Sequence, residues 1–176
     1  MAKQQGFTFS DKWNYRFMQM AQLIATWSKD NSTKVGCVIV GPNKTILSMG
    51  YNGFPRGIQD NVPSRWTRPT KYDFVVHAEE NALLNAGRNG TRLDGGILYA
   101  TMAPCTRCAG SIIQSGIREI IYLDPDLDRQ IPGWRDSLDI SFQMFEEAGV
   151  KYKSLGTAQD MMQNITRMQK INDNSR

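Results

Sequence analysis

Two short segments of the sequence carry side chains that can bind a metal ion together. Cys105 and Cys108 are separated by two residues in the segment 104–108, and His77 begins the segment 77–79. Two thiolates with this spacing at a helix start can bind one ion, because the helix dipole lowers their pKa and favours the deprotonated form. The imidazole of His77, at a neighbouring helix start, completes three ligands. The pattern predicts a zinc site.

The number of ligands indicates a catalytic rather than a structural zinc site. Structural zinc sites usually have four protein ligands, whereas a catalytic site leaves one position for water. The sequence contains no second histidine and one further cysteine, Cys37. Cys37 lies in the middle of a predicted strand and is interpreted as a small buried thiol. Three protein ligands plus a water molecule therefore indicate catalysis.

Glu79 follows His77 by two residues and is predicted to be the general acid and base. Zinc lowers the pKa of a coordinated water toward ~7, so hydroxide forms near neutral pH. Glu79 can lie beside that water without binding the metal and transfer its proton. A structural zinc site and a redox-active cysteine pair are alternatives for the cysteine motif alone. The two motifs in this order, each at a helix start, favour the hydrolytic site.

The hydrophobic pattern predicts the scaffold that brings these helix starts together. Apolar residues three or four apart predict helices over residues 11–28, 76–86, 106–115, 136–148 and 157–172. Extended patterns predict strands over residues 34–40, 45–51, 97–101, 119–123 and 150–154. The first two strands form an antiparallel hairpin, and the strand-helix-strand order predicts a parallel pair, so the sheet is mixed and the layout is α/β/α. The stretch 53–69, with three prolines and no sustained period, is interpreted as a long ordered loop.

Length and composition indicate one globular domain inside the cell. The chain has 176 residues, with 40% hydrophobic and 22% charged residues, which favours a single domain over residues 1–176 and excludes disorder. No window of ~20 apolar residues predicts a membrane span, and residues 1–11 lack a signal-like apolar segment. Three cysteines are typical of a metal site in a reducing compartment, so a cytoplasmic location is expected. The formal net charge of +4 is too small to indicate nucleic-acid binding.

The two metal motifs and several further segments resemble the deoxycytidylate (dCMP) deaminase family of the cytidine deaminase superfamily. A His-x-Glu motif followed by Pro-Cys-x-x-Cys is the signature of zinc-dependent nucleobase deaminases. The resemblance covers about residues 17–152 and extends to the segments 28–30, 32–36, 50–55, 77–82, 104–108 and 112–117. The segment 50–53 and the long insertion before His77 resemble dCMP deaminases more than tRNA adenosine deaminases. The insertion contains neither histidine nor cysteine, so one zinc ion per chain is expected. The tail, a helical extension from about residue 155, exceeds the shorter family members.

This resemblance implies a three-layer α/β/α fold with a mixed five-stranded sheet and a specific reaction. The reaction is the hydrolytic deamination of dCMP to dUMP and ammonia, which feeds thymidylate synthesis. Asn52 and Tyr122 lie at predicted strand ends, where ligands of such sheets collect. The resemblance implies that Asn52 contacts the sugar and that backbone groups of Ala78 and Cys105 hold the base.

The resemblance also implies a homohexamer that dCTP activates and dTTP inhibits. Segments implicated in this control in the family match Lys29, Asp30, Gly53 and Phe54. Lys29 is expected to attract the triphosphate with its Mg²⁺, Gly53 to let backbone amides approach it, and Phe54 to pack on a neighbouring subunit. The alternative is that Lys29 and Asp30 merely end the first helix.

The alternatives to this function are a nucleic-acid base deaminase and a zinc-stabilised binding module. A nucleic-acid base deaminase, acting on tRNA or single-stranded DNA, would need a basic groove and stacking aromatics, and the modest charge argues against it. A zinc-stabilised binding module would leave Glu79 without a role. Basic residues of the insertion, Arg56, Arg65, Arg68 and Lys71, can hold a phosphate or simply lie in solvent, and none of them is assigned.

Overall fold

The computed structural model describes residues 10–124 and 134–173, and its centre is a five-stranded sheet in the order β2-β1-β3-β4-β5. β1 (Gly36–Val40) pairs antiparallel with both β2 (Ile46–Tyr51) and β3 (Ile97–Ala100). β3, β4 (Glu119–Tyr122) and β5 (Lys151–Ser154) run parallel to one another. The prediction of a mixed five-stranded sheet is confirmed.

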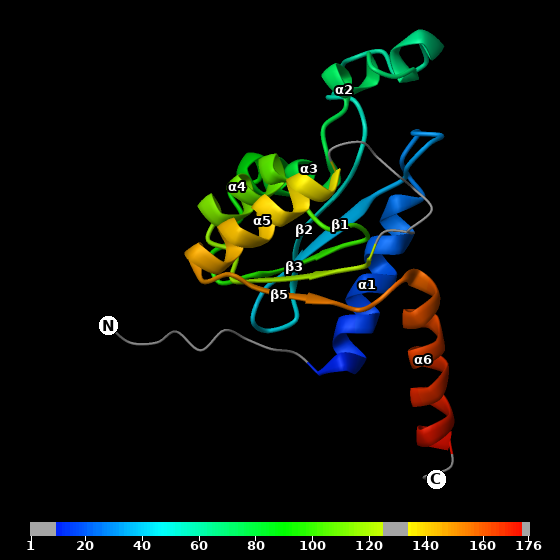
Figure 1. Ribbon diagram of the computed structural model, residues 1–176, viewed down its shortest axis with the longest axis vertical. Helices are drawn as coiled ribbons and strands as arrows, with labels where there is room; N and C mark the ends of the chain where they lie inside the picture. Colours follow the sequence, from blue (N-terminus) through cyan, green and yellow to red (C-terminus); the bar gives the residue numbers. More distant parts are fainter. Residues whose placement is uncertain (1–9, 125–133, 174–176) are drawn as a thin grey trace.

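Helices cover both faces of this sheet. Figure 1 shows α3 (Ala78–Arg88), α4 (Thr106–Gln114) and α5 (Trp134–Ala148) on one face, and α1 (Asp11–Ala25) and α6 (Ala158–Asp173) on the other. Strand residues alternate between the two cores: Ile39, Leu98 and Ile120 belong to one, and Val38, Tyr99 and Ile121 to the other. β1, β3 and β4 are buried throughout because both of their faces are covered. The three-layer α/β/α arrangement is confirmed.

The first helix is three residues shorter than predicted. The helix of residues 11–28 ends at Ala25, and Thr26 turns its hydroxyl back to the carbonyl of Leu23. The hydroxyl of Ser28 then donates to the carbonyl of Asn52 at 2.7 Å. A contact with the end of β2 therefore overrides the helical pattern at these residues.

The C-terminal helix α6 belongs to the same layer as α1. Met161 is fully buried, and Ile165 packs against the core on that face of the sheet. The apolar stripe of this helix thus covers the sheet beside α1. Among the described residues, no helix combines the length and the apolar character required to cross a membrane.

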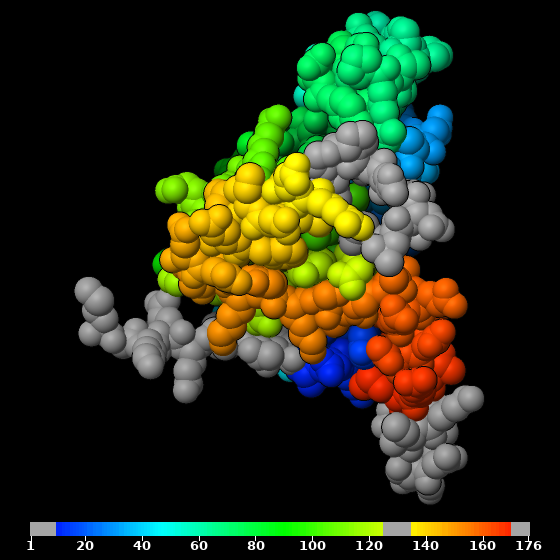
Figure 2. All heavy atoms as spheres, viewed as in Figure 1, coloured from blue at the N-terminus to red at the C-terminus, as the bar shows by residue number. Residues whose placement is uncertain are grey.

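The insertion before His77 forms an ordered lobe at one end of the molecule, drawn in blue-green at the top of Figure 2. An antiparallel bridge between Gly53 and Val76 closes it at its base. Within it, the short helices η1 (Pro63–Trp66) and α2 (Lys71–Phe74) interrupt what the sequence predicts as loop. The ring of Phe54 stacks on that of Trp66 at 4.2 Å between centroids. Four-residue helices are too short to produce a detectable period, so the sequence pattern misses them.

Gly50 lets α3 pack directly on β2. A Cβ atom at Gly50 would lie 2.4 Å from the carbonyl oxygen of Ala78 and 2.4 Å from the amide nitrogen of Ala82. Ser48, two residues earlier on the same face of the strand, donates its hydroxyl to the carbonyl of Ala82 at 2.6 Å. The start of α3 is therefore positioned by a backbone-to-backbone contact that only glycine permits.

Two asparagines of α3 also cap the outer edge of β2. Asn81 and Asn85, one helical turn apart, donate their side-chain amides to the carbonyls of Tyr51 at 2.8 Å and Met49 at 2.9 Å. These bonds satisfy carbonyls that an edge strand would otherwise leave open. They also fix α3 along the length of the strand.

Replacing Gly50 by alanine should destabilise the fold by about 1–3 kcal/mol, because the new Cβ overlaps backbone atoms of α3 that have no room to move. Chemical denaturation gives the free energy of unfolding. The matched control is Gly87→Ala in the same helix, where no atom lies within 4 Å and the loss of glycine should be neutral or stabilising by up to about 1 kcal/mol. Equal stability of Gly50→Ala and wild type would contradict the close contact.

Candidate active site

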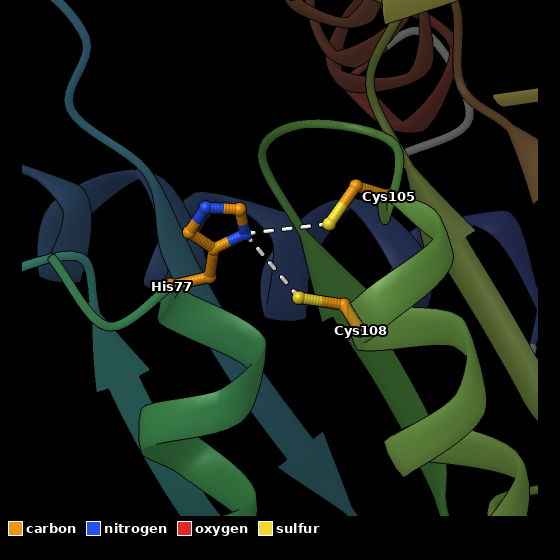
Figure 3. A group of neighbouring side chains, drawn as sticks. All are labelled: His77, Cys105 and Cys108. Carbon is orange, nitrogen blue, oxygen red and sulfur yellow. Dashed lines mark hydrogen bonds between the residues drawn. The ribbon is translucent and has the colours of Figure 1, made fainter. Parts of the chain in front are cut away.

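The two predicted metal motifs meet at neighbouring helix starts. His77 is the N-cap residue of α3 and Cys105 is the N-cap residue of α4, with Cys108 in the first turn of α4. Figure 3 shows the two sulfur atoms pointing toward the imidazole ring. α4 follows the carboxyl end of β3, and α3 lies beside α4 on the same face of the sheet. The tertiary structure thus brings together residues 28 and 31 positions apart in the sequence.

The distances within this triad fit a zinc ion. Nδ1 of His77 lies 3.5 Å from Sγ of Cys105 and 3.4 Å from Sγ of Cys108. Tetrahedral zinc with ordinary Zn–N and Zn–S bond lengths would place nitrogen and sulfur about 3.6 Å apart. All three ligand atoms lie within 4.8 Å of one another, and both cysteines are buried. The donor set, one imidazole and two thiols, is the one zinc prefers.

Hydrogen bonding within the triad favours a thiolate. The bond from the thiol of Cys108 lowers the pKa of Cys105 to about 4, against the effect of burial, and His77 adds to the lowering. The same bond and burial raise the pKa of Cys108, because its thiol keeps the shared proton. The bond with Cys105 raises the pKa of His77, which burial opposes. The triad therefore carries a stabilised anionic sulfur, as a cation site requires.

Glu79 lies in the first turn of α3, next to the triad but outside the three residues that form it. Its side chain is 4% exposed and contributes to the wall of a pocket. Burial raises the pKa of Glu79 to about 7, although the charge of His77 opposes this shift. Cys37 is fully buried. Burial raises the pKa of its thiol, and the negative charge of Glu79 raises it further. Cys37 is therefore a core thiol, as expected, and Glu79 is the carboxyl group available for proton transfer.

His77 of the triad and Glu79 line a pocket of about 460 Å³. Its lining contains five of the residues singled out from the sequence: Asp30, Asn52, His77, Ala78 and Glu79. The remainder come from the loop before β1, the insertion and the loop after β3: Thr33, Val35, Arg68, Lys71, Tyr72, Val75, Met102 and Ala103. Most of these lie in segments without a regular period, so the sequence offers no signal that they share a wall.

Asn52 organises the wall of this pocket through its side chain. Its Oδ1 accepts from the amide of Val35 at 2.8 Å, and its Nδ2 donates to the carbonyl of Thr33 at 2.8 Å. Nδ2 also lies 3.4 Å from Oδ2 of Asp30. Asn52 thereby holds the loop before β1 in place. Tyr122, the other strand-end residue, lies outside the pocket lining and packs its ring on Phe142 at 5.7 Å.

Of the four residues matched to effector control, Gly53 and Phe54 lie in the insertion, and Lys29 and Asp30 contact it. Lys29 forms an ion pair with Asp60 at 2.8 Å, and Gly53 bridges to Val76. Phe54 packs its ring against aromatic rings of the insertion. Asp30 pairs with a lysine of α2 and, unlike the other three, lies in the pocket wall.

The ion pair between Asp30 and Lys71 is buried, with side chains 4% and 6% exposed and a separation of 2.9 Å. Burial alone would raise the pKa of Asp30, but hydrogen bonds from Lys71 and Ser32 outweigh it and hold the pKa below its usual value. The carboxylate also accepts from the amide of Thr33. One buried carboxylate thus joins the insertion to the loop before β1 across the pocket wall.

Comparison with known proteins agrees with this geometry. The sequence model of the family described as the cytidine and deoxycytidylate deaminase zinc-binding region matches residues 11–124. The chain is 42% identical to an uncharacterized deaminase of Aliivibrio fischeri over 140 residues, covering 80% of this chain and 91% of that protein. It is 37% identical to human deoxycytidylate deaminase over 147 residues, covering 81% and 79% of the two chains.

A solved structure extends the likeness to three dimensions. The dCMP deaminase of cyanophage S-TIM5, in complex with dCMP and dUMP, superposes with a TM-score of 0.66 at 28% identity. The match covers 84% of this chain and 99% of the phage chain. With the zinc-binding region matched over most of the described sequence and its three ligand atoms gathered at two helix starts, the chain belongs to the cytidine and deoxycytidylate deaminase family.

Proposed function

We propose that this protein catalyses the zinc-dependent hydrolytic deamination of dCMP to dUMP and ammonia. The observation that carries the proposal is that the buried Glu79 and His77, the histidine of a His-Cys-Cys triad, line the same pocket. The pocket volume of about 460 Å³ lies within the range of about 300–1,000 Å³ typical of small-molecule sites. These features support a reaction on a small ligand that is enclosed by the protein.

The choice of dCMP is supported by the relatives. The human relative is named a deoxycytidylate deaminase, and the phage structure holds dCMP and dUMP. The insertion that supplies part of the pocket wall also brings the basic side chain of Arg68 to it, and a phosphorylated substrate requires such a cation. The product dUMP would serve thymidylate synthesis, and the predicted single domain and cytoplasmic location are consistent with a nucleotide enzyme.

In the proposed mechanism, His77, Cys105 and Cys108 hold the zinc ion. When bound, zinc lowers the pKa of a water molecule and so supplies the nucleophile. Glu79 accepts a proton from this water and delivers it to N3 of cytosine while the water oxygen bonds to C4. Glu79 would then take the second proton from the new C4 hydroxyl and give it to the exocyclic nitrogen. The C4–N bond breaks, ammonia leaves, and the C4 carbonyl of dUMP is formed.

The remaining pocket residues position the nucleotide. The backbone of Ala78 lies in the pocket lining at the N-terminus of α3, where amide groups point outward and can hold the base edge. Oδ1 of Asn52 uses one lone pair for the amide of Val35, and we assign the other to a sugar hydroxyl. The substrate contact of Tyr122 stays a prediction.

Regulation by dCTP and dTTP, with Mg²⁺ on the triphosphate, is part of the proposal. Lys29 and Asp30 form ion pairs with the insertion, Gly53 and Phe54 belong to it, and the insertion supplies part of the pocket wall. An effector that binds these residues more tightly in one arrangement of the insertion would change the pocket. The free energy by which the effector shifts the equilibrium equals the difference between its binding free energies for the two arrangements.

The proposed homohexamer requires a surface for self-association, and the molecule exposes one. Leu23 lies in the last turn of α1, Trp27 lies in the turn that follows it, and Met49 and Tyr51 lie on one face of β2. All four are between 39% and 61% exposed, and the rings of Trp27 and Tyr51 contact each other at 6.1 Å. We name these four residues the α1/β2 patch. A group of exposed apolar side chains of this kind supports a protein interface.

The zinc-loaded protein should convert dCMP to dUMP with one ammonia per turnover, and Glu79→Gln should lower turnover by at least ~100-fold while zinc and fold are kept. Ammonia release, product chromatography and metal analysis measure these quantities. A tRNA hairpin and a single-stranded cytosine-containing DNA should remain unreacted. Reaction of either nucleic acid without reaction of dCMP would replace this function by nucleic-acid base deamination.

Cys105→Ala is the contrasting variant in the same experiment. With two ligands left, the protein should lose both its zinc and its activity. Stoichiometric zinc in Cys105→Ala, or near-wild-type turnover of Glu79→Gln, would contradict the assigned roles.

Saturation with dCMP should be sigmoidal without effector, hyperbolic with dCTP and Mg²⁺, and shifted to higher concentration with dTTP. Lys29→Ala should need more dCTP for the same activation, because the cation expected to attract the triphosphate is removed. Lys44→Ala, an exposed lysine in the turn of the β1-β2 hairpin, is the control and should respond as wild type does. Hyperbolic curves that neither nucleotide changes would refute the regulation.

Sedimentation should give the mass of six chains for the wild-type protein and a smaller mass for Trp27→Asp, because the charge would be buried in the α1/β2 patch. Ile140→Asp, which alters an exposed apolar residue of α5, is the control and should keep the wild-type mass. A monomeric wild type, or a hexameric Trp27→Asp, would exclude this surface as the interface.

A further inference from the structure

The charges in the pocket wall identify the group that recognises the substrate phosphate, an inference that rests on the proposed function. The wall contains two carboxyl groups, Asp30 and Glu79, and the cationic side chains Arg68 and Lys71. A phosphate carries close to two negative charges and needs a cation that no carboxylate already neutralises. The phosphate would therefore bind the cation of the wall that has no carboxylate partner.

Lys71 is not available as a free charge. Its ammonium is buried and lies 2.9 Å from Oδ2 of Asp30, and it also donates to the hydroxyl of Ser32. Hydrogen bonds from Lys71 and Ser32 outweigh the effect of burial and hold the pKa of Asp30 below its usual value, so its carboxylate stays ionised beside the ammonium at neutral pH. Lys71 therefore anchors the insertion and contributes little net charge to the pocket.

Arg68 is the cation that remains. Its side chain is exposed and lines the pocket, and within the described part of the chain no carboxylate lies at ion-pair distance from it. Its guanidinium lies 6.0 Å from the centroid of the Tyr72 ring, which also lines the pocket. The ring offers the guanidinium a partner that leaves its N–H groups free for an anion.

The other cations around the insertion are engaged elsewhere and lie outside the pocket lining. Lys29 pairs with Asp60, and Arg56 donates to Oδ1 of Asn85 at 2.7 Å. Arg65 donates to the carbonyl of Gln59 at 3.1 Å. Position and pairing thus single out one arginine of this lobe.

We infer that Arg68 binds the 5′-phosphate of the substrate and makes the enzyme prefer a nucleotide to a nucleoside. A guanidinium can form two parallel hydrogen bonds with two phosphate oxygens, which a lysine cannot reproduce. The lobe stands beyond the end of the sheet, connected through residues 75–77 to the start of α3 (Figures 1 and 2). Arg68 is a specificity residue: it contacts the phosphate and takes no part in proton transfer.

The test compares dCMP with deoxycytidine, which lacks the phosphate, in zinc-loaded wild type, Arg68→Ala and Arg68→Lys. In Arg68→Ala, kcat/KM for dCMP should fall by about 10- to 100-fold, because the variant loses hydrogen bonds between charged groups. For deoxycytidine the loss should stay within about twofold. Arg68→Lys should recover part of the activity on dCMP. Arg56→Ala, an exposed arginine of the same lobe outside the pocket lining, is the control and should behave as wild type does with both substrates.

Equal losses for dCMP and deoxycytidine in Arg68→Ala, or no loss for dCMP, would overturn the inference. A calorimetric titration of zinc-loaded Glu79→Gln with dCMP and deoxycytidine separates this result from failure of the proposed reaction. Tighter binding of dCMP than deoxycytidine that disappears in Glu79→Gln/Arg68→Ala supports the phosphate site even if no deamination is seen. Equal affinity for dCMP and deoxycytidine, in both Glu79→Gln and Glu79→Gln/Arg68→Ala, would refute the phosphate site.

Discussion

The backbone contact between α3 and β2 at Gly50 is the constraint on which the site depends. It fixes how close the helix lies to the sheet, since the carbonyl of Ala78 and the amide of Ala82 occupy the space of the missing Cβ. His77 precedes this helix directly and Glu79 lies in its first turn, so their positions follow from the same contact. The triad then forms because α4 begins beside α3, with Cys105 at its N-cap. A small shift of one helix would separate the nitrogen from the sulfur atoms by more than a zinc ion spans.

A second constraint, the buried pair of Asp30 and Lys71, determines how the insertion meets the rest of the protein. Burial of an ion pair contributes little net stability, but removal of one partner leaves an uncompensated charge at a cost of about 3–5 kcal/mol. The depressed pKa of Asp30 means that its stabilising contribution is complete above the unfolded pKa near 4 and is lost as the pH falls below it. At neutral pH the pair is intact, and the insertion is held against the loop before β1, beside Asn52.

The proposed substrate binding and the proposed regulation both depend on one structural element, the insertion. The insertion supplies Arg68, Lys71 and Tyr72 to the pocket, and its base contacts the residues matched to effector control. The residues proposed for catalysis form a different set, at the starts of α3 and α4, and the sheet holds both helices in place. A change in the insertion could therefore alter substrate binding and leave the zinc triad intact, as the proposed regulation requires.

The sequence by itself determined the chemistry and the layers of the fold. His77, Cys105, Cys108 and Glu79 could be found because residue type and short spacing are local properties, and the single histidine left one choice of ligand. Alternating and helical hydrophobic patterns likewise predicted the mixed sheet and its covering helices. Only the tertiary structure decided which polar groups pair and which remain free. Lys71 and Asp30 are 41 residues apart, and no pattern distinguishes Lys71 from Arg68 until the fold buries one beside a carboxylate and leaves the other in the pocket. The same holds for the end of α1, because Ser28 leaves the helical path for a hydrogen bond to Asn52, 24 residues away, and such a long-range contact has no local signature.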